Sequence, residues 1–346
     1  MDHYPLPRPE DLFATLEAGA CFIKLDLSRA YHQLELDDTS KALTTITTPY
    51  GLYQYNRLPF GVAVAPAKFQ RVMEEIIGGL SYVKIFLDDL LIVAKDKEES
   101  WKRLEIVLAK LQKAGVRLQL SKCCFEMQEY LGLIVSKEGL KTSKNKIKAI
   151  IEMEPPQNVG ELRTFLGLIN YYGRLFVPKL SQEAYPLNEL LQKNKKWRWQ
   201  DREQKAWERL RSLLASAEVL CHFDPKLKIK LDCDASPFGV AAVLSHVFLD
   251  GSERPIAYAS RSLTQAEKNY SQLDKEALAI IFGIKRFHPY LYGNHFVLVT
   301  DHKPLLSILG PKSEVPSLAA ARLQRWALIL SPFSYEMEFR RTRGSQ

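Results

Sequence analysis

Seven acidic side chains occupy positions where they could hold divalent cations. They form two groups, one in each half of the chain: Asp26, Asp88 and Asp89, followed by Asp232, Asp234, Glu276 and Asp301. Phosphoryl transfer on nucleic acids commonly uses two divalent cations about 4 Å apart that carboxylates hold in place. Because Mg2+ prefers hard oxygen ligands, each group is a candidate magnesium site.

A strand and a hairpin must bring the first group together. The alternation of residues 21–27 predicts a strand that carries Lys24 and Asp26 on one face. Two apolar runs then meet at Asp88 and Asp89, which predicts a hairpin with both carboxylates at its turn. Adjacent strands could place Asp26 beside this pair. Taken alone, an acidic pair at a turn is more often solvated surface than a metal site.

The second group lies in a predicted α/β unit. Its strands are expected at 228–233, 240–247, 255–260, 296–300 and 335–339, and its helices at about 266–290 and 318–330. Glu276 precedes the apolar stripe residue Ala277 in the first helix, so we expect it at the edge of the buried face. An unpaired carboxylate there is costly unless a cation balances it. Asp232 and Asp301, taken singly, fit ordinary strand-end turns better than catalysis.

The middle of the chain is predicted to be largely helical. Further helices are expected at 67–77, at 100–114 and from Asn158, which forms a capping-box-like start with Glu161, and another hairpin at 130–140. A segment then interleaves cations with aromatic residues: Lys193, Lys195, Lys196, Trp197, Arg198 and Trp199. Such a pattern suits a surface that stacks bases and tracks a phosphate backbone. A solvated linker whose two tryptophans pack on a helix explains it equally well.

Composition excludes several protein classes. With 346 residues, 46% hydrophobic and 25% charged, the chain fits a globular protein of two or more domains. It has no apolar run of membrane-spanning length and no apolar signal region, so we expect no membrane contact and a cytoplasmic or nuclear location. The net charge of +8 favours polyanionic partners. The five cysteines lack zinc or disulfide spacing, so we expect reduced, buried thiols.

Eight motifs carry a resemblance to a known family. They are DHYPLP at 2–7, KLDLSRAYHQ at 24–33, YQYNRLPFG at 53–61, FLDD at 86–89, FLGL at 165–168, CDAS at 233–236, EALA at 276–279 and TDHKPL at 300–305. In this order they resemble the Pol polyprotein of gypsy-type LTR retrotransposons, namely its reverse transcriptase followed by its ribonuclease H. The resemblance covers nearly the whole chain.

The resemblance implies an α+β and α/β multidomain fold. Its expected parts are a reverse transcriptase palm with residual, truncated fingers at 1–142, a helical thumb or connection at 143–215, and a ribonuclease H-like mixed sheet with helices at 216–346. It also implies an enzyme that copies RNA into DNA and cleaves the RNA strand of RNA–DNA hybrids. The implied partners are an RNA template, a DNA primer, the RNA–DNA hybrid and deoxynucleoside triphosphates.

The resemblance also assigns roles to single residues. Asp26, Asp88 and Asp89 become the polymerase ligands of Mg2+, for which Mn2+ could substitute. Tyr31 becomes a steric gate under the incoming sugar and Phe60 part of the nucleotide pocket, although both could be ordinary core aromatics. Residues 130–135 resemble the hairpin that grips the primer. Asp234, Glu276 and Asp301 become the ligands of the nuclease metal, with Asp232 outside the matched positions.

Three departures from the family shape the expected activity. Phe86 replaces the usual tyrosine of the acidic hairpin motif, the cationic fingers segment upstream is missing, and so is the C-terminal helix of the ribonuclease H with its fourth carboxylate. We therefore expect weak or absent polymerisation and impaired hybrid cleavage. The alternative is a catalytically impaired nucleic-acid-binding remnant or domesticated fragment. Protease and integrase domains could belong to the parent polyprotein, and the sequence leaves the oligomeric state open.

Overall fold

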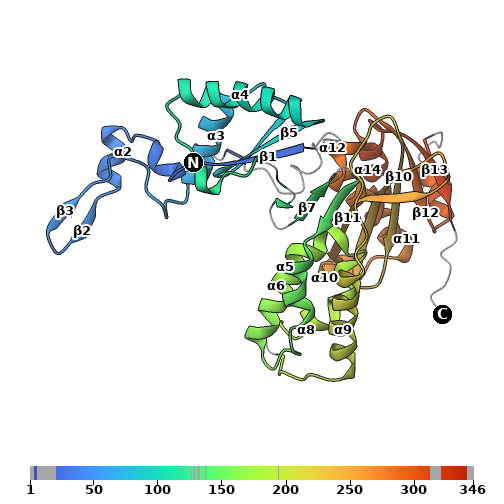
Figure 1. Cartoon of the computed structure of the whole chain (residues 1–346). Helices are drawn as coiled ribbons and strands as arrows, with labels where there is room; N and C mark the ends of the chain where they lie inside the picture. The colour runs from blue at the N-terminus through green and yellow to red at the C-terminus, as the bar shows by residue number, and fades with distance from the viewer. Residues whose placement is uncertain are drawn as a thin grey trace. The chain divides into compact units, whose positions relative to one another are not determined.

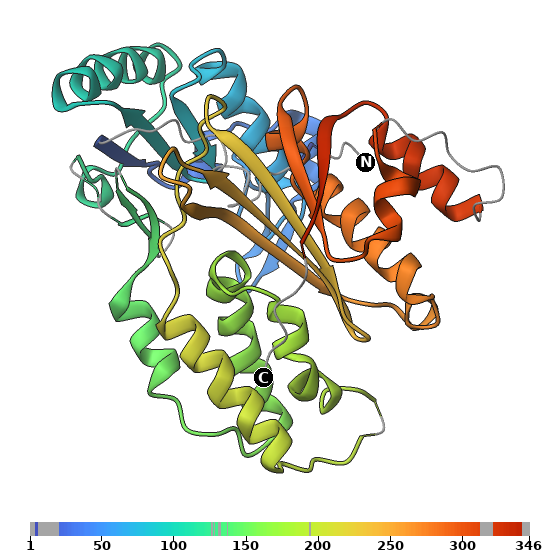
Figure 2. The ribbon, with the colours of Figure 1, turned by 90° about the vertical axis from the view of Figure 1, so that its right-hand side faces the viewer.

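The computed structural model describes residues 4–5, 21–125, 127, 129–130, 133–136, 138–193, 195–311 and 321–340. The chain divides into two compact units (Figures 1 and 2). Unit 1 comprises residues 1–131 and 135–137, and unit 2 comprises residues 132–134 and 138–346.

Unit 1 is built on an antiparallel sheet with the strand order β1-β5-β4. Its main elements are β1 (Cys21–Asp26), α3 (Ala65–Ile77), β4 (Val83–Phe86), β5 (Asp89–Ala94) and α4 (Lys97–Lys113). Both helices pack on the sheet, and Phe69 of α3 and Leu104 of α4 join strand residues in one apolar cluster. The predicted strand, hairpin and helices are thus confirmed, with β4 and β5 turning at the acidic pair.

Smaller elements of unit 1 follow the first strand. They are η1 (Ala30–Gln33), α2 (Asp38–Leu43), the hairpin β2 (Ile46–Thr48) and β3 (Gly51–Tyr53), and the later turn η2 (Leu120–Lys122). A further sheet, β6-β7-β8, contains β6 (Glu129–Tyr130), β7 (Leu133–Ser136) and β8 (Gly139–Thr142). The predicted hairpin at 130–140 corresponds to these last strands.

A helical region follows β8 in unit 2 and forms the green to yellow bundle in Figure 1. Its elements are α5 (Lys144–Ile151), α6 (Val159–Phe176), α7 (Leu180–Glu183), α8 (Tyr185–Glu189) and α9 (Asp201–Ala215). The predicted start of α6 is confirmed, because Asn158 accepts a hydrogen bond from the Glu161 amide at 2.9 Å. Leu162, Phe165 and Ile169 of this helix are fully buried.

The helical region begins and ends at one point. The amides and carbonyls of Leu140 and Leu220 exchange two backbone hydrogen bonds, of 2.8 and 2.9 Å. Gly139, with φ 137°, precedes this pair, and a Cβ there would lie 1.9 Å from the Leu220 carbonyl oxygen. Only glycine fits this conformation and this close approach.

Unit 2 contains a five-stranded sheet with the strand order β11-β10-β9-β12-β13. Its strands are β9 (Lys228–Ala235), β10 (Gly239–Val247), β11 (Glu253–Ser262), β12 (His295–Thr300) and β13 (Ser334–Phe339). The first three pair antiparallel, while β12 pairs parallel with both β9 and β13. The helix α11 (Gln272–Arg286) packs on β9 and β10 (Figure 2), and α13 (Pro304–Leu309) and α14 (Ala321–Leu330) join the same core.

Three sequence-based expectations about these elements need correction. The helix expected at 266–290 is three helices, α10 (Gln265–Lys268), α11 and α12 (His288–Leu291), because Ser271 caps α11 and Pro289 lacks an amide to continue it. The helix expected from residue 100 starts at Lys97, because Asp96 caps it. All five cysteines are free, but only Cys233 is buried, and Cys124 is exposed.

None of the helices in the described part of the chain is both long enough and apolar enough to cross a membrane.

Candidate functional site

The first acidic group meets at one end of the unit 1 sheet. Asp26, the last residue of β1, lies opposite Asp89, the first residue of β5. Asp88 is held next to them, because its carbonyl accepts a 3.1 Å hydrogen bond from the Leu27 amide. Leu87, the other residue of the two-residue turn, has a φ of 55°, a left-handed conformation unusual for leucine. The structure therefore places all three predicted carboxylates at one strand end.

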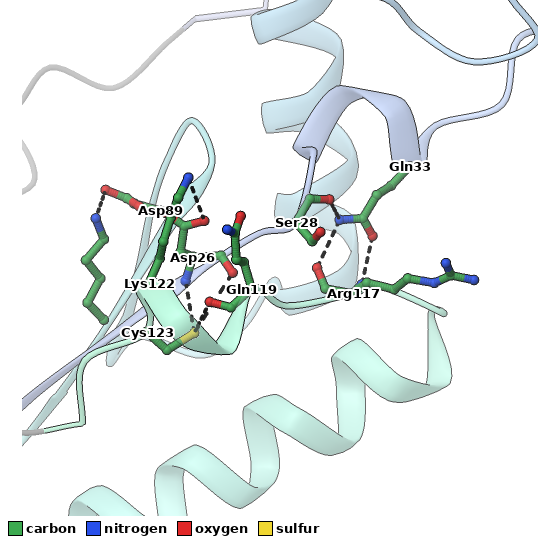
Figure 3. Close-up of polar contacts among 9 residues, drawn as sticks. Asp26, Ser28, Gln33, Asp89, Arg117, Gln119, Lys122 and Cys123 are labelled. Carbon is green, nitrogen blue, oxygen red and sulfur yellow. Dashed lines mark hydrogen bonds and ion pairs between the residues drawn. The ribbon is translucent and has the colours of Figure 1, made fainter.

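Two lysines pair with these carboxylates. Lys24 Nζ lies 2.8 Å from Asp89 Oδ2, and Lys122 Nζ lies 3.9 Å from Asp26 Oδ1 (Figure 3). Burial raises the pKa of Asp89, an effect that Lys24 opposes and that the charges of Asp88 and Asp26 reinforce. Among the described residues, the ligand oxygens of these three acids do not gather within 4.8 Å of one another. The three residues are thus neighbours in the backbone, but their carboxylate oxygens do not surround a common point.

A network of hydrogen bonds holds the strand end in place. The Gln33 side chain donates to the carbonyls of Ser28 and Arg117 at 2.6 and 3.0 Å, and it accepts from the Arg117 amide at 2.7 Å (Figure 3). The Gln119 amide donates to the Asp26 carbonyl at 2.9 Å. Segments far apart in sequence therefore position Asp26. The sequence reasoning missed Gln33 and Lys122, whereas Lys24 carried a signal, since it shares a strand face with Asp26.

Tyr31 and Phe60 lie together beside the acidic turn. Their ring centroids are 5.1 Å apart, and Tyr31 also meets Phe69 edge-on at 5.5 Å. Burial first, and then the charge of Asp88, raise the pKa of the Tyr31 hydroxyl. Phe60 is 60% exposed, so it is not an ordinary core aromatic. The two predicted nucleotide-binding residues thus contact each other, and Tyr31 lies near enough to Asp88 for its charge to act on the hydroxyl.

The carboxylate oxygens of three residues of the second acidic group lie closer together than those of the first. One ligand oxygen each of Asp234, Glu276 and Asp301 lies within 4.8 Å of the other two. The adjacent strands β9 and β12 deliver Asp234 and Asp301, and α11, which packs on the sheet, delivers Glu276. The expectation that Glu276 is buried is confirmed, since it is only 4% exposed. Three carboxylates at this spacing form a donor set of the hard-oxygen type that Mg2+ and Mn2+ prefer.

Burial and neighbouring charge favour the protonated form of Glu276. Its two oxygens accept hydrogen bonds from the Ala235 amide, at 3.1 Å, and from the Gln272 side chain. Burial, reinforced by the negative charges of Asp301 and Asp234, nevertheless raises the pKa of Glu276 to about 7. A divalent cation among the three carboxylates would relieve both effects. The residues therefore fit a metal ion.

Stability should depend on pH through Glu276 when no metal is bound. Because the pKa of about 7 exceeds the ordinary value, the folded state binds this proton more tightly than the unfolded chain. This stabilisation is complete below the ordinary glutamate pKa of about 4.3 and is lost as the pH rises through about 7. It amounts to at most about 4 kcal/mol, since each pKa unit is worth about 1.4 kcal/mol. Urea unfolding with a chelator at pH 5 and pH 8 measures it.

Two comparisons check this pH dependence. Glu276→Gln should flatten this part of the profile, and Mg2+ added at pH 8 should restore stability to the unsubstituted protein. A profile that Glu276→Gln leaves unchanged would contradict the assignment of the proton to Glu276.

Asp232, which the sequence placed outside the matched positions, also lies outside this cluster. It forms an ion pair of 4.0 Å with Arg340, and Arg340 also donates to Glu253 at 2.8 Å. Asp232, Asp234 and Asp301 line a cavity of about 610 Å³ together with Arg340 and Lys179. No local sequence pattern indicates a role for Lys179, which belongs to the helical region.

The structure tests the packing interpretation of the basic and aromatic segment before α9, but it does not test the nucleic-acid-binding interpretation. Trp197 and Trp199 stack on each other at 5.8 Å, pack against the helical core and are partly buried. Trp199 also donates to Gln204 at 2.8 Å. The packing interpretation therefore holds for the tryptophans. Lys193, Lys195, Lys196 and Arg198 are exposed, which leaves their predicted contact with a polyanion untested.

Comparison with known families assigns both halves of the chain. Residues 1–169 match the family described as reverse transcriptase (RNA-dependent DNA polymerase), and residues 224–333 match the RNase H-like domain found in reverse transcriptase. The chain carries a reverse transcriptase domain and an RNase H-like domain. The first carboxylate group lies in the reverse transcriptase domain and the second in the RNase H-like domain.

Relatives and solved structures agree with this assignment. The chain is 37% identical over 343 residues to the Transposon Tf2-3 and Tf2-4 polyproteins of Schizosaccharomyces pombe, and the match covers 97% of the chain. The chain spans 25% of the length of these polyproteins. A foamy viral protease-reverse transcriptase in complex with an RNA/DNA hybrid has the same fold, with a TM-score of 0.81 at 21% identity over 99% of this chain and 46% of that chain. Its complex with dsDNA matches with a TM-score of 0.81 at 22% identity, over 100% and 73% of the two chains.

Proposed function

We propose that the protein is the RNA-directed DNA polymerase and ribonuclease H of a gypsy-type LTR retrotransposon Pol polyprotein. The closed carboxylate cluster of Asp234, Glu276 and Asp301, in a chain that carries both domains in this order, is the observation that carries the proposal. The similarity to the Tf2 transposon polyproteins supports the retrotransposon origin. The remnant interpretation is not favoured, because the chain keeps every carboxylate of both acidic groups.

In the nuclease, three carboxylates would hold the metal and this chain would orient the substrate. Asp234, Glu276 and Asp301 would bind Mg2+ or Mn2+, which supplies activation of water and stabilisation of charge on the phosphate. Glu276 must give up its proton for this to happen, so we expect metal binding to strengthen toward pH 8. The cavity beside the cluster is where the RNA strand of a hybrid would lie.

In the polymerase, Asp26, Asp88 and Asp89 would hold the metal ions for transfer of a nucleotide to the primer. Lys24 and Lys122 neutralise two of these carboxylates in the structure and would move as the metal ions bind. The Tyr31 and Phe60 rings would then face the sugar and base of a deoxynucleoside triphosphate. An RNA template, a DNA primer and their hybrid are the proposed partners. Protease and integrase as further parts of the parent polyprotein are also a proposal.

Two assays test the proposed function. The protein should extend a DNA primer on an RNA template weakly and should cleave the RNA strand of a labelled hybrid at a reduced rate, in both cases only with Mg2+ or Mn2+. A chelator should stop both reactions. Failure of both, with template-primer binding intact, would favour the remnant instead. That binding should weaken steeply with salt, because phosphate contacts release counterions.

Tyr31 should set the choice between deoxyribonucleotides and ribonucleotides. Tyr31→Val removes a ring that stands next to Phe60 and leaves room for a 2′-hydroxyl. We expect ribonucleotide incorporation to rise at least about 10-fold relative to deoxynucleotide incorporation, the effect of about 1.4 kcal/mol of relieved clash. Tyr31→Phe is the matched control, since it keeps the ring. Equal discrimination by the valine and phenylalanine variants would exclude a steric gate.

A further inference from the structure

A lysine from the helical region contacts the nuclease carboxylates. Lys179 Nζ lies 2.6 Å from Asp234 Oδ2. Lys179 is the N-cap residue of α7, whereas Asp234 belongs to β9 of the sheet. The lysine side chain lines the cavity beside the cluster and is 44% exposed, so one end of it reaches water.

The segment that carries Lys179 is held against the sheet. The Ser181 amide donates to Ser260 Oγ of β11 at 3.0 Å, and Tyr185 of α8 stacks on Phe238 with ring centroids 4.2 Å apart. Lys179 itself adopts the left-handed conformation, with φ 54° and ψ 29°, which costs a non-glycine residue about 1 kcal/mol. The contacts of Ser181 and Tyr185 with the sheet, together with the left-handed backbone of Lys179, therefore place the lysine next to Asp234.

The second cation that lines the cavity is engaged elsewhere. Arg340 donates to Glu253 at 2.8 Å, and its approach to Asp232 is 4.0 Å. Of these two cations, Lys179 is thus the one that forms an ion pair with a residue of the carboxylate cluster.

We propose that Lys179 is the built-in counter-ion of the nuclease carboxylates and must leave Asp234 when a divalent cation binds. This inference rests on the proposed nuclease function. Two like charges at such close range repel strongly, so the ammonium and the metal ion compete for the same carboxylate oxygen. The exposed side chain can swing into the cavity, where a phosphate of the bound strand would be its next partner. Lys179 is accordingly a positioning residue that sets the affinity of the site for metal.

Binding of Mn2+ to the whole chain tests this competition without an activity assay. Lys179→Asn removes the charge and keeps a side chain that tolerates the left-handed conformation. Free Mn2+, followed by electron paramagnetic resonance at low salt, should show at least about 5-fold tighter binding to this variant, because a close positive charge has been removed. Each protein carries Asp26→Asn, which removes the proposed polymerase site from the measurement. In this background Lys179→Arg should bind as the protein with Lys179 does, and Asp234→Asn should bind far more weakly.

A matched control separates this contact from general charge. Lys226→Asn removes one positive charge from an exposed lysine of the same unit and should leave Mn2+ affinity unchanged. Equal affinity of the unsubstituted and Lys179→Asn proteins, with Asp234→Asn impaired, would overturn the competition and leave the metal site standing. The same tightening in Lys226→Asn would also overturn it. Absence of Mn2+ binding in every protein would remove the metal site and the inference together.

Discussion

Glu276→Gln should lower the rate of magnesium-dependent cleavage of an RNA–DNA hybrid at least about 100-fold. The amide keeps the size and the hydrogen bond from the Ala235 amide, but it cannot carry the negative charge that balances a metal ion. Because the free glutamate is buried beside Asp234 and Asp301, the substitution should also stabilise the metal-free fold. Lost cleavage therefore cannot be attributed to unfolding. Single-turnover cleavage of a labelled hybrid measures the effect.

Asp232→Asn is a stringent control for this experiment. Asp232 lies two residues from Asp234 on the same strand and lines the same cavity, but it pairs with Arg340 and stands outside the cluster. Its substitution should change cleavage no more than about 3-fold, as for an exposed ion pair. If Asp232→Asn reduced cleavage as much as Glu276→Gln, the assignment of the cluster would be wrong. Hybrid binding should be equal in both variants.

Asp26→Asn should lower primer extension at least about 100-fold, by the same loss of metal-binding charge. Asp26 is 7% exposed, its carbonyl accepts a hydrogen bond from the Gln119 amide, and it lies opposite Asp89 of β5, so the amide should occupy the same place. Its ion pair with Lys122 is long, at 3.9 Å, and its loss should cost little stability. Extension of a labelled primer on an RNA template, with saturating deoxynucleotides, measures the effect.

The control for primer extension is Glu75→Gln on α3. Glu75 pairs with Arg71 one helical turn away and is largely exposed, so its charge should not affect the reaction. Because the two metal sites belong to different domains, Asp26→Asn should leave hybrid cleavage unchanged. Loss of both activities from Asp26→Asn would indicate a fold defect and would contradict separate sites.

The local elements could be predicted from the sequence because their patterns are short. Two apolar runs that meet at Asp88 and Asp89 leave few alternatives to a hairpin, and the structure turns there. Asn158 and Glu161 marked the start of α6 by a capping pattern of four residues. Glu276 could be placed at the buried face because it adjoins the apolar stripe of its helix. Each of these inferences uses interactions within one element or one turn.

Other features depend on packing between distant segments, which no local pattern reports. The register that sets Asp26 opposite Asp89 is a property of two strands, and the contact of Lys179 with Asp234 needs the helical region to dock on the sheet. The burial of cysteines was predicted wrongly for a similar reason. Cys233 points into the core from a central strand, whereas Cys124 lies in an irregular segment that leaves it exposed.

The hydrogen bonds between Leu140 and Leu220 hold the two ends of the helical region side by side, so the region leaves the rest of unit 2 and returns to it at the same place. Because its two ends already meet, changing the length of chain between them alters closure entropy only slowly, by about 0.6 kcal/mol per doubling. Helices could therefore be lengthened, exchanged or grafted from a related element without moving the strands at the junction. Evolution of this region would then be constrained mainly where α6 and α7 pack on the sheet, which includes the lysine that meets the nuclease carboxylates.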